Sequence, residues 1–208
     1  MKLAVFGGSS KTGALLLEQA LKAGHEVTAL ARTPSKVTLQ HQKLTVVPGD
    51  AQNPAAVARV IDGAEAVISL MGPTSNAAQM TISAATQNIL TAMQTVNLRR
   101  LVLVTGAGVG DPHDKPGLID RIFKLVLGVV SKNVIADMLN VARMVRASGV
   151  EWTIVRAPML TDAPAQGATR VGYLGSVGVR LSRADLAAFT LQQVEDRSYV
   201  RQAPVISN

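Results

Sequence analysis

The sequence has 208 residues, 48% of them hydrophobic and 17% charged, which is enough apolar material for one folded domain and excludes a largely disordered chain. It contains no cysteine, so disulfides, thiolate zinc sites, iron–sulfur clusters and cysteine nucleophiles are excluded, and its three scattered histidines predict no metal site. The formal charge of +7 favours anionic ligands, but the basic residues do not cluster and no nucleic-acid-binding motif is present, so no nucleic acid partner is expected.

Short apolar runs alternate with segments of helical periodicity along the chain. The runs that predict strands are residues 3–6, 26–31, 44–47, 66–70, 101–105, 152–155 and 199–206. The segments that predict helices are residues 14–23, a short helix opening at Thr33-Pro34, and residues 53–61, 76–96, 118–130, 134–147 and 182–194. This alternation predicts an α/β fold with a Rossmann-like, doubly wound parallel sheet. It also predicts a single domain over residues 1–208, with small substrate-side elements toward its C-terminus.

The segment 118–130, LIDRIFKLVLGVV, is unusually apolar and covers more than one helical face. Its role is open between a lid over a pocket, a subunit interface and a membrane-surface helix, and the chain is expected to be a monomer or a homodimer. No apolar run reaches the ~18 residues that span a bilayer, so no membrane span is expected. Since no signal peptide is visible either, a cytoplasmic location is expected.

A glycine-rich segment, GGSSKTG at residues 7–13, joins the first predicted strand to the first predicted helix. Gly7 permits a tight turn off the strand, the backbone N–H groups at the helix start point at a diphosphate, and Gly13 lets the helix pack closely on the sheet. A P-loop for nucleoside triphosphates needs glycine where Ser10 and Val5 stand, so that alternative is excluded. The residues predicted to bind the diphosphate of a dinucleotide are Gly7, Ser9, Ser10, Lys11, Thr12 and Gly13.

The end of the second predicted strand indicates which dinucleotide is bound. Sites specific for NAD place an acid there to bind the ribose 2′-hydroxyl, whereas this chain has Arg32, with Lys36 one turn further on. Arginine accommodates a 2′-phosphate, so NADP(H) is the predicted cofactor. Asp50, which follows the third predicted strand, is expected to accept a hydrogen bond from the adenine amino group.

Five segments together resemble a known family: GGSSKTG, the pair Ala31-Arg32, LMGP at residues 70–73, LVLVTGAG at 101–108 and VEWTIVRAP at 150–158. They are similar to the atypical short-chain dehydrogenases/reductases, and within these to the NAD(P)-binding, NmrA-like group that includes flavin reductase (biliverdin-IXβ reductase). The resemblance implies that the adenine lies near Asp50 and Ala51. It places the nicotinamide between three sets of residues, which are Leu70, Met71 and Gly72; Thr105, Gly106 and Ala107; and Pro158, Met159 and Leu160.

The sequence departs from this family at its catalytic positions. Flavin reductases have Thr-Ser at the end of the fifth strand, where this chain has Thr105-Gly106, so Thr105 is the remaining candidate for a catalytic residue. The Tyr-x-x-x-Lys motif of the main short-chain enzymes has no counterpart, and alignment puts Val134 and Met138 in its place. Two other groups are candidates near the pocket: Asp162, and His113, for which an exposed loop position is favoured over a proton-donor role.

These departures leave two main hypotheses for function. The first is an NADPH-dependent reductase of a small-molecule acceptor such as a flavin, a quinone or a similar planar compound, which can take its proton from solvent. The second is a non-catalytic NADP(H)-sensing regulatory protein of the NmrA type. A carbonyl reductase is less favoured because it needs a positioned acid.

Overall fold

Within residues 1–73, 80–115, 117 and 132–208, which the computed structural model describes, eight strands form one sheet in the order β3-β2-β1-β4-β5-β6-β10-β8. Their bounds are β1 Lys2–Phe6, β2 Glu26–Ala31, β3 Leu44–Pro48, β4 Ala66–Ser69, β5 Arg100–Gly106, β6 Glu151–Ala157, β8 Arg170–Gly172 and β10 Val205–Ser207. All neighbouring pairs are parallel except β10 and β8, which are antiparallel. A separate parallel pair joins β7 (Met159–Thr161) to β9 (Arg180–Ser182).

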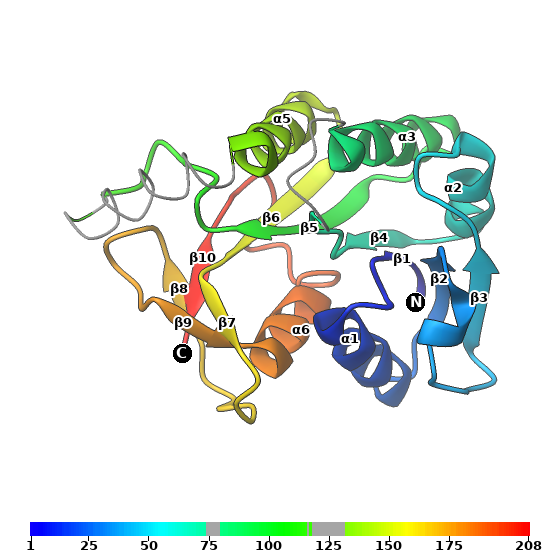
Figure 1. Ribbon diagram of the computed structural model, residues 1–208, viewed down its shortest axis with the longest axis horizontal. Helices are drawn as coiled ribbons and strands as arrows, with labels where there is room; N and C mark the ends of the chain where they lie inside the picture. The colour runs from blue at the N-terminus through cyan, green and yellow to red at the C-terminus, as the bar shows by residue number, and fades with distance from the viewer. Residues whose placement is uncertain (74–79, 116, 118–131) are drawn as a thin grey trace.

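Helices cover both faces of the sheet (Figure 1). One face carries α2 (Pro54–Ile61), α3 (Thr81–Thr95) and α5 (Lys132–Ala147), and the other carries α1 (Lys11–Lys22) and α6 (Arg183–Gln192). A short 3₁₀ turn, η1 (Pro34–Lys36), follows β2. Each face has its own apolar core, so the central strands β1 and β4 are buried on both sides, as expected of parallel strands in a doubly wound sheet. The predicted Rossmann-like α/β fold is therefore confirmed.

The order of the strands fixes where a ligand can bind. The chain runs from β1 outward to β3 on one side and resumes with β4 on the other side of β1. The carboxyl ends of β1 and β4 therefore form a switch point, and open α/β sheets bind their ligands at such points.

The first helix begins earlier than predicted. It starts at Lys11 rather than Ala14, because the Ser10 side chain accepts a hydrogen bond from the backbone N–H of Gly13 and so caps the helix. Lys11, Thr12 and Gly13 of the glycine-rich segment therefore form the first turn of α1.

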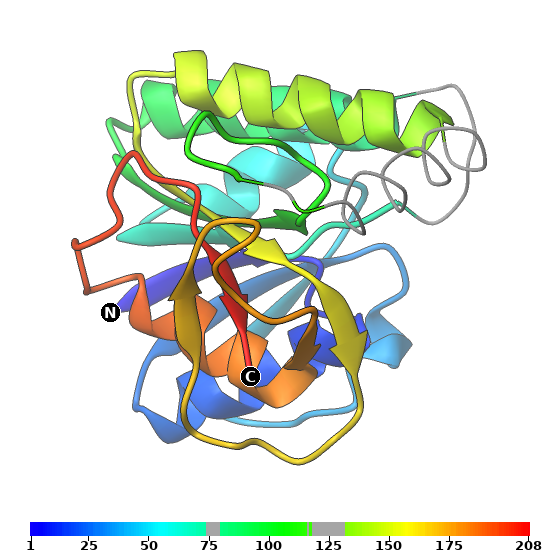
Figure 2. The ribbon, with the colours of Figure 1, turned by 90° about the vertical axis from the view of Figure 1, so that its left-hand side faces the viewer.

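The C-terminal part differs most from the prediction. The strand expected at 199–206 is only Val205–Ser207, since Arg201 has a positive φ of 59° and Pro204 has no N–H to donate. Figure 2 shows the short strands β7, β8 and β9 in gold and orange near the red β10. They were not predicted, because three residues are too few to show an alternating pattern. The expected helix at 118–130, and residues 76–79 of the helix expected at 76–96, lie outside the described residues.

The N-terminus of α3 is capped from another helix. Its own cap residue, Met80, has a left-handed backbone and provides no side-chain bond. Instead the buried carboxylate of Asp137 in α5 accepts the backbone N–H groups of Ile82 at 3.0 Å and Ser83 at 2.9 Å, and also the Ser83 hydroxyl. This one side chain therefore joins α3 to α5.

Replacing Asp137 by alanine should lower the free energy of unfolding by about 2–3 kcal/mol, because two backbone N–H groups lose their acceptor in a buried place. Urea unfolding followed by circular dichroism measures the change. The control is Arg143→Ala, an exposed change on the same helix. If both variants unfold at the same urea concentration, Asp137 does not stabilise the protein as a cap.

Candidate cofactor site

The glycine-rich segment forms a tight cradle between β1 and α1. Gly7 has a φ of +86°, and a Cβ atom there would lie 2.7 Å from the backbone carbon of Leu70. A Cβ at Gly13 would lie 2.2 Å from the carbonyl oxygen of Gly7 and 2.7 Å from the Cα of Gly8. Backbone therefore approaches backbone at both glycines, so neither position has room for a side chain, and a turn this tight suits the diphosphate of a dinucleotide.

The first turn of α1 provides donors and a positive charge at this cradle. The Ser10 hydroxyl forms its hydrogen bonds within the loop. It donates to the Gly7 carbonyl at 2.9 Å and accepts from the Gly13 N–H at 3.0 Å. The N–H groups of Lys11 and Thr12 have no intrahelical acceptor, as at the start of any α-helix. They and the helix dipole favour an anion.

Lys11 contacts the segment that follows β7. Its Nζ lies 2.9 Å from one oxygen of Asp162, and the Arg183 guanidinium at the start of α6 lies 2.6 Å from the other. The hydrogen bond from Lys11, and then the charge of Arg183, hold the pKa of Asp162 below its ordinary value of 3.8. Asp162 is therefore a carboxylate at this edge, and Arg183 is a nearby cation that the sequence prediction did not include.

The adenosine end of the predicted site lies beside β2 and β3. Arg32 directly follows β2 and is exposed, and no described residue forms an ion pair with it. Asp50 follows β3, where its carboxylate accepts the Gln52 N–H at 2.8 Å. Ala51 is buried, and its carbonyl accepts a hydrogen bond of 3.0 Å from the Asn88 side chain of α3.

The nicotinamide end of the predicted site lies at the ends of β4, β5 and β6. Leu70, Met71 and Gly72 follow β4, and the Leu70 backbone contacts Gly7. The Ala107 N–H donates to the Ala157 carbonyl at 2.7 Å, which holds the loop after β5 beside Pro158.

Side chains at this end point in different directions. Met159 is 54% exposed, whereas Leu160 packs against the core on the α1 and α6 face. The Thr105 side chain is buried, and neither its hydroxyl nor that of Ser69 at the end of β4 has a hydrogen-bond partner among the described residues. The topology thus brings every predicted site residue to one edge of the sheet, while the catalytic role of Thr105 stays a prediction.

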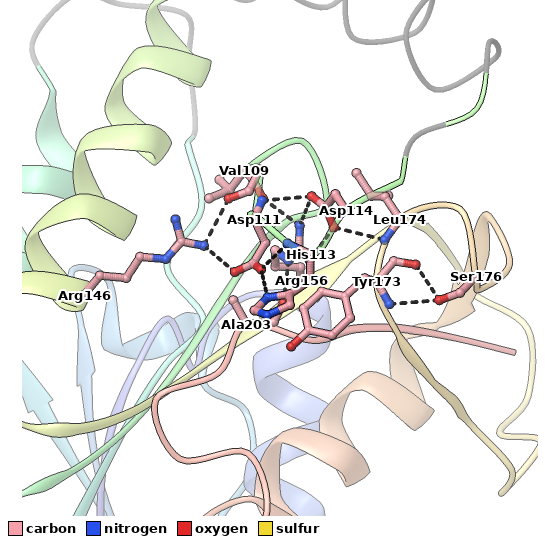
Figure 3. A network of polar contacts seen from close by, with 11 residues as sticks. Val109, Asp111, His113, Asp114, Arg146, Arg156, Tyr173, Leu174, Ser176 and Ala203 are labelled. Carbon is pink, nitrogen blue, oxygen red and sulfur yellow. Dashed lines mark hydrogen bonds and ion pairs between the residues drawn. The ribbon is translucent and has the colours of Figure 1, made fainter.

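A buried ion pair holds the loop after β5 on the sheet (Figure 3). The Arg156 side chain in β6 is fully buried and donates to both oxygens of Asp114, at 2.7 and 2.8 Å. It also donates to the carbonyls of Val109 and Ala203. Asp114 accepts the Leu174 N–H as well, so one carboxylate joins the loop, β6 and the turn after β8. The prediction gave Arg156 and Asp114 no role, although a charged residue inside an apolar strand signals a buried partner.

His113 lies on the outside of the same network. Its Nδ1 is 2.8 Å from Asp111, its ring lies 5.0 Å from that of Tyr173, and its side chain is 71% exposed. Arg146 of α5 contacts the other oxygen of Asp111. The expected exposed loop position of His113 is confirmed.

Most of the chain matches the sequence model of one protein family. A model described as NAD(P)H-binding matches residues 7–197 of this chain. The chain belongs to this NAD(P)H-binding family. The matched region contains the glycine-rich segment and the loops that follow β2, β3, β4, β5 and β6.

Two curated relatives share parts of the sequence. An uncharacterized protein of Bacillus subtilis is 32% identical over 108 residues, which are 52% of this chain and 48% of that protein. An isoflavone reductase homolog of Arabidopsis thaliana is 25% identical over 94% of this chain and 65% of its own length. The chain thus spans from about half to just under two thirds of these relatives.

Three solved structures share the fold over the entire chain. They are an oxidoreductase from Lactococcus lactis (TM-score 0.83, 18% identity, 91% of that chain), a short-chain dehydrogenase/reductase from Veillonella parvula in complex with NADP (0.80, 18%, 94%) and an anaerobilin reductase from Escherichia coli O157:H7 (0.79, 21%, 97%). At these identities they establish the Rossmann-like fold. In addition, no helix among the described residues is long and apolar enough to cross a membrane.

Proposed function

We propose that this protein is an NADPH-dependent oxidoreductase that reduces a flavin, a quinone or a similar planar acceptor. The observation that carries the proposal is the backbone cradle at Gly7 and Gly13, which lies at the switch point of the sheet in a chain of the NAD(P)H-binding family. The exposed Arg32 at the end of β2 supports NADPH over NADH. The reductases among the structural relatives agree with a small-molecule acceptor.

The chain's own residues would bind the cofactor and orient it. NADPH supplies the hydride when it is bound. The glycine cradle and Lys11 would hold the diphosphate, and the backbone at Leu70, Ala107 and Pro158 would border the nicotinamide. Flavins and quinones take up a hydride without a positioned acid, so water can deliver the proton.

A second candidate function follows from two residues of α5 that stand where the main short-chain enzymes have their catalytic Tyr and Lys. The residues at the places of the short-chain Tyr and Lys are Val134 and Met138, and Met138 is buried in the core. Neither can donate a proton. This observation favours a protein that senses NADP(H) without turning it over.

The test is oxidation of NADPH by the purified full chain, followed at 340 nm with FMN, riboflavin and a simple quinone as acceptors. NADH runs in parallel. Turnover that prefers NADPH supports the reductase. Tight NADPH binding without turnover on any acceptor supports the sensor, and absence of binding overturns both.

Replacing Arg32 by alanine should weaken NADPH binding about 10- to 100-fold and leave NADH binding within about twofold, since only NADPH carries a 2′-phosphate. Fluorescence titration of each nucleotide measures the dissociation constants. Arg143→Ala, which removes an exposed arginine on α5, controls for the change in net charge. An equal loss for the two nucleotides would show that Arg32 does not recognise the 2′-phosphate.

A further inference from the structure

Two cations from distant parts of the chain share one carboxylate at the mouth of the cradle. Lys11 Nζ and Arg183 Nη1 lie 2.9 and 2.6 Å from the two oxygens of Asp162. Both cations stand at the first position of a helix, Lys11 in α1 and Arg183 in α6, and these two helices pack together on one face of the sheet. The arrangement therefore concentrates positive charge beside the loop that is proposed to bind a diphosphate.

The contacts of Asp162 suit a counter-ion that can be exchanged. Its side chain is 63% exposed, that of Lys11 is 73% exposed, and the carboxylate has no further protein donor among the described residues. An ion pair as exposed as that between Lys11 and Asp162 contributes little to stability, typically below about 1 kcal/mol, whereas the Arg183 side chain is only 24% exposed. In contrast, Ser182 caps α6 through its own buried hydroxyl, so the start of that helix does not depend on Asp162.

We propose that Lys11 and Arg183 form one diphosphate-binding pair, and that Asp162 is the internal carboxylate they release when the dinucleotide binds. This inference rests on the dinucleotide-binding part of the proposed function and is independent of turnover. A diphosphate carries more negative charge than a carboxylate and offers more acceptor oxygens, so it forms the stronger charge-assisted hydrogen bonds. Asp162 competes with it for the same donors and repels it.

The proposal predicts opposite effects of two substitutions on nucleotide binding. Asp162→Asn removes the competing charge and should tighten binding of NADPH and NADH alike, by roughly five- to tenfold, since both carry the same diphosphate. Arg183→Gln removes one of the two cations and should weaken both by a similar factor. Because the effect is electrostatic and exposed, the gain in Asp162→Asn should shrink as salt is raised from 0.05 to about 0.5 M.

The measurement is the dissociation constant of each nucleotide by fluorescence titration, with no acceptor present. The matched control is Glu18→Gln, which removes an exposed carboxylate from another lysine ion pair on α1, at 2.6 Å from Lys22. Unchanged or weaker binding in Asp162→Asn overturns the proposal, as does an effect of the same size in Glu18→Gln. If Asp162 were only structural, its substitution would weaken binding rather than tighten it.

Inorganic pyrophosphate separates this inference from the proposed function. If the wild-type chain binds neither dinucleotide, the proposed function fails, and calorimetric titration with pyrophosphate then decides the inference. Tighter pyrophosphate binding in Asp162→Asn and weaker binding in Arg183→Gln would support the cation pair. Equal binding in all three proteins would overturn it.

Discussion

Replacing Asp114 by alanine is expected to lower the free energy of unfolding by about 3–5 kcal/mol, because it leaves the Arg156 guanidinium buried without its counter-charge. The Arg156 side chain is 0% exposed, and two of its hydrogen bonds go to this carboxylate. Asp114 also accepts the backbone N–H groups of Asp111 and Leu174. The loop after β5 and the turn after β8 would therefore lose their common anchor.

Urea unfolding followed by circular dichroism measures this loss. Glu18→Ala is the control, because it breaks an exposed ion pair and should cost less than about 1 kcal/mol. The double variant Asp114→Leu, Arg156→Met removes both charges and should recover much of the lost stability. If Asp114→Ala loses no more than Glu18→Ala, the ion pair does not hold the loop.

The same carboxylate predicts sensitivity to acid. Burial by itself raises the pKa of Asp114, but the hydrogen bonds from Arg156 and from the backbone of Asp111 and Leu174 hold it below the ordinary value of 3.8. A lowered carboxyl pKa stabilises the folded state above that ordinary value, and the stabilisation is lost as the pH falls through the folded-state pKa. The difference in Tm between the wild type and Asp114→Ala should therefore be constant above about pH 5 and shrink below about pH 4.

Replacing Gly13 by alanine is expected to weaken NADPH binding by about 100-fold or more, since the added methyl group would sit 2.2 Å from the Gly7 carbonyl oxygen. The neighbouring atoms belong to the backbone of Gly7 and Gly8, which no side-chain rotation can move away. Either α1 shifts outward or the loop closes, and both displace the donors at the start of the helix.

Nucleotide titration and urea unfolding together test this prediction. Gly149→Ala is the control, because a Cβ atom there meets nothing within 4 Å. The loss of binding should exceed what a loss of overall stability explains, so the variant must be folded under the titration conditions. Unchanged NADPH affinity in Gly13→Ala would contradict the placement of the diphosphate at this cradle.

The sequence could predict the strands β1 to β6 because each is a short, largely apolar run. The strands β1, β4, β5 and β6 are buried on both faces, whereas the edge strand β3 is only partly buried. Once these strands alternate with helices, right-handed crossovers bring their carboxyl ends to one edge, and the loops with Gly7, Arg32, Leu70 and Thr105 follow. The positions of these loops thus depend on topology alone, and no side-chain detail is needed.

The remaining features depend on contacts between residues far apart in the sequence. Asp137 caps a helix that begins more than fifty residues earlier, and Arg156 pairs with Asp114 across about forty. No local pattern specifies such partners. Asp162 was a candidate for chemistry near the pocket, but its two cations come from opposite ends of the chain, so its role as their counter-ion could not be predicted.

The place of β10 in the sheet constrains the order in which the fold can be completed. This strand follows β8 in sequence but lies between β6 and β8, so β8 has no partner in the sheet until β10 has been inserted beside β6. During synthesis, residues 170–172 leave the ribosome before residues 205–207 and must wait for them. The strands β1 to β6 can pair before residues 205–207 are available, and β8 joins the sheet only after β10.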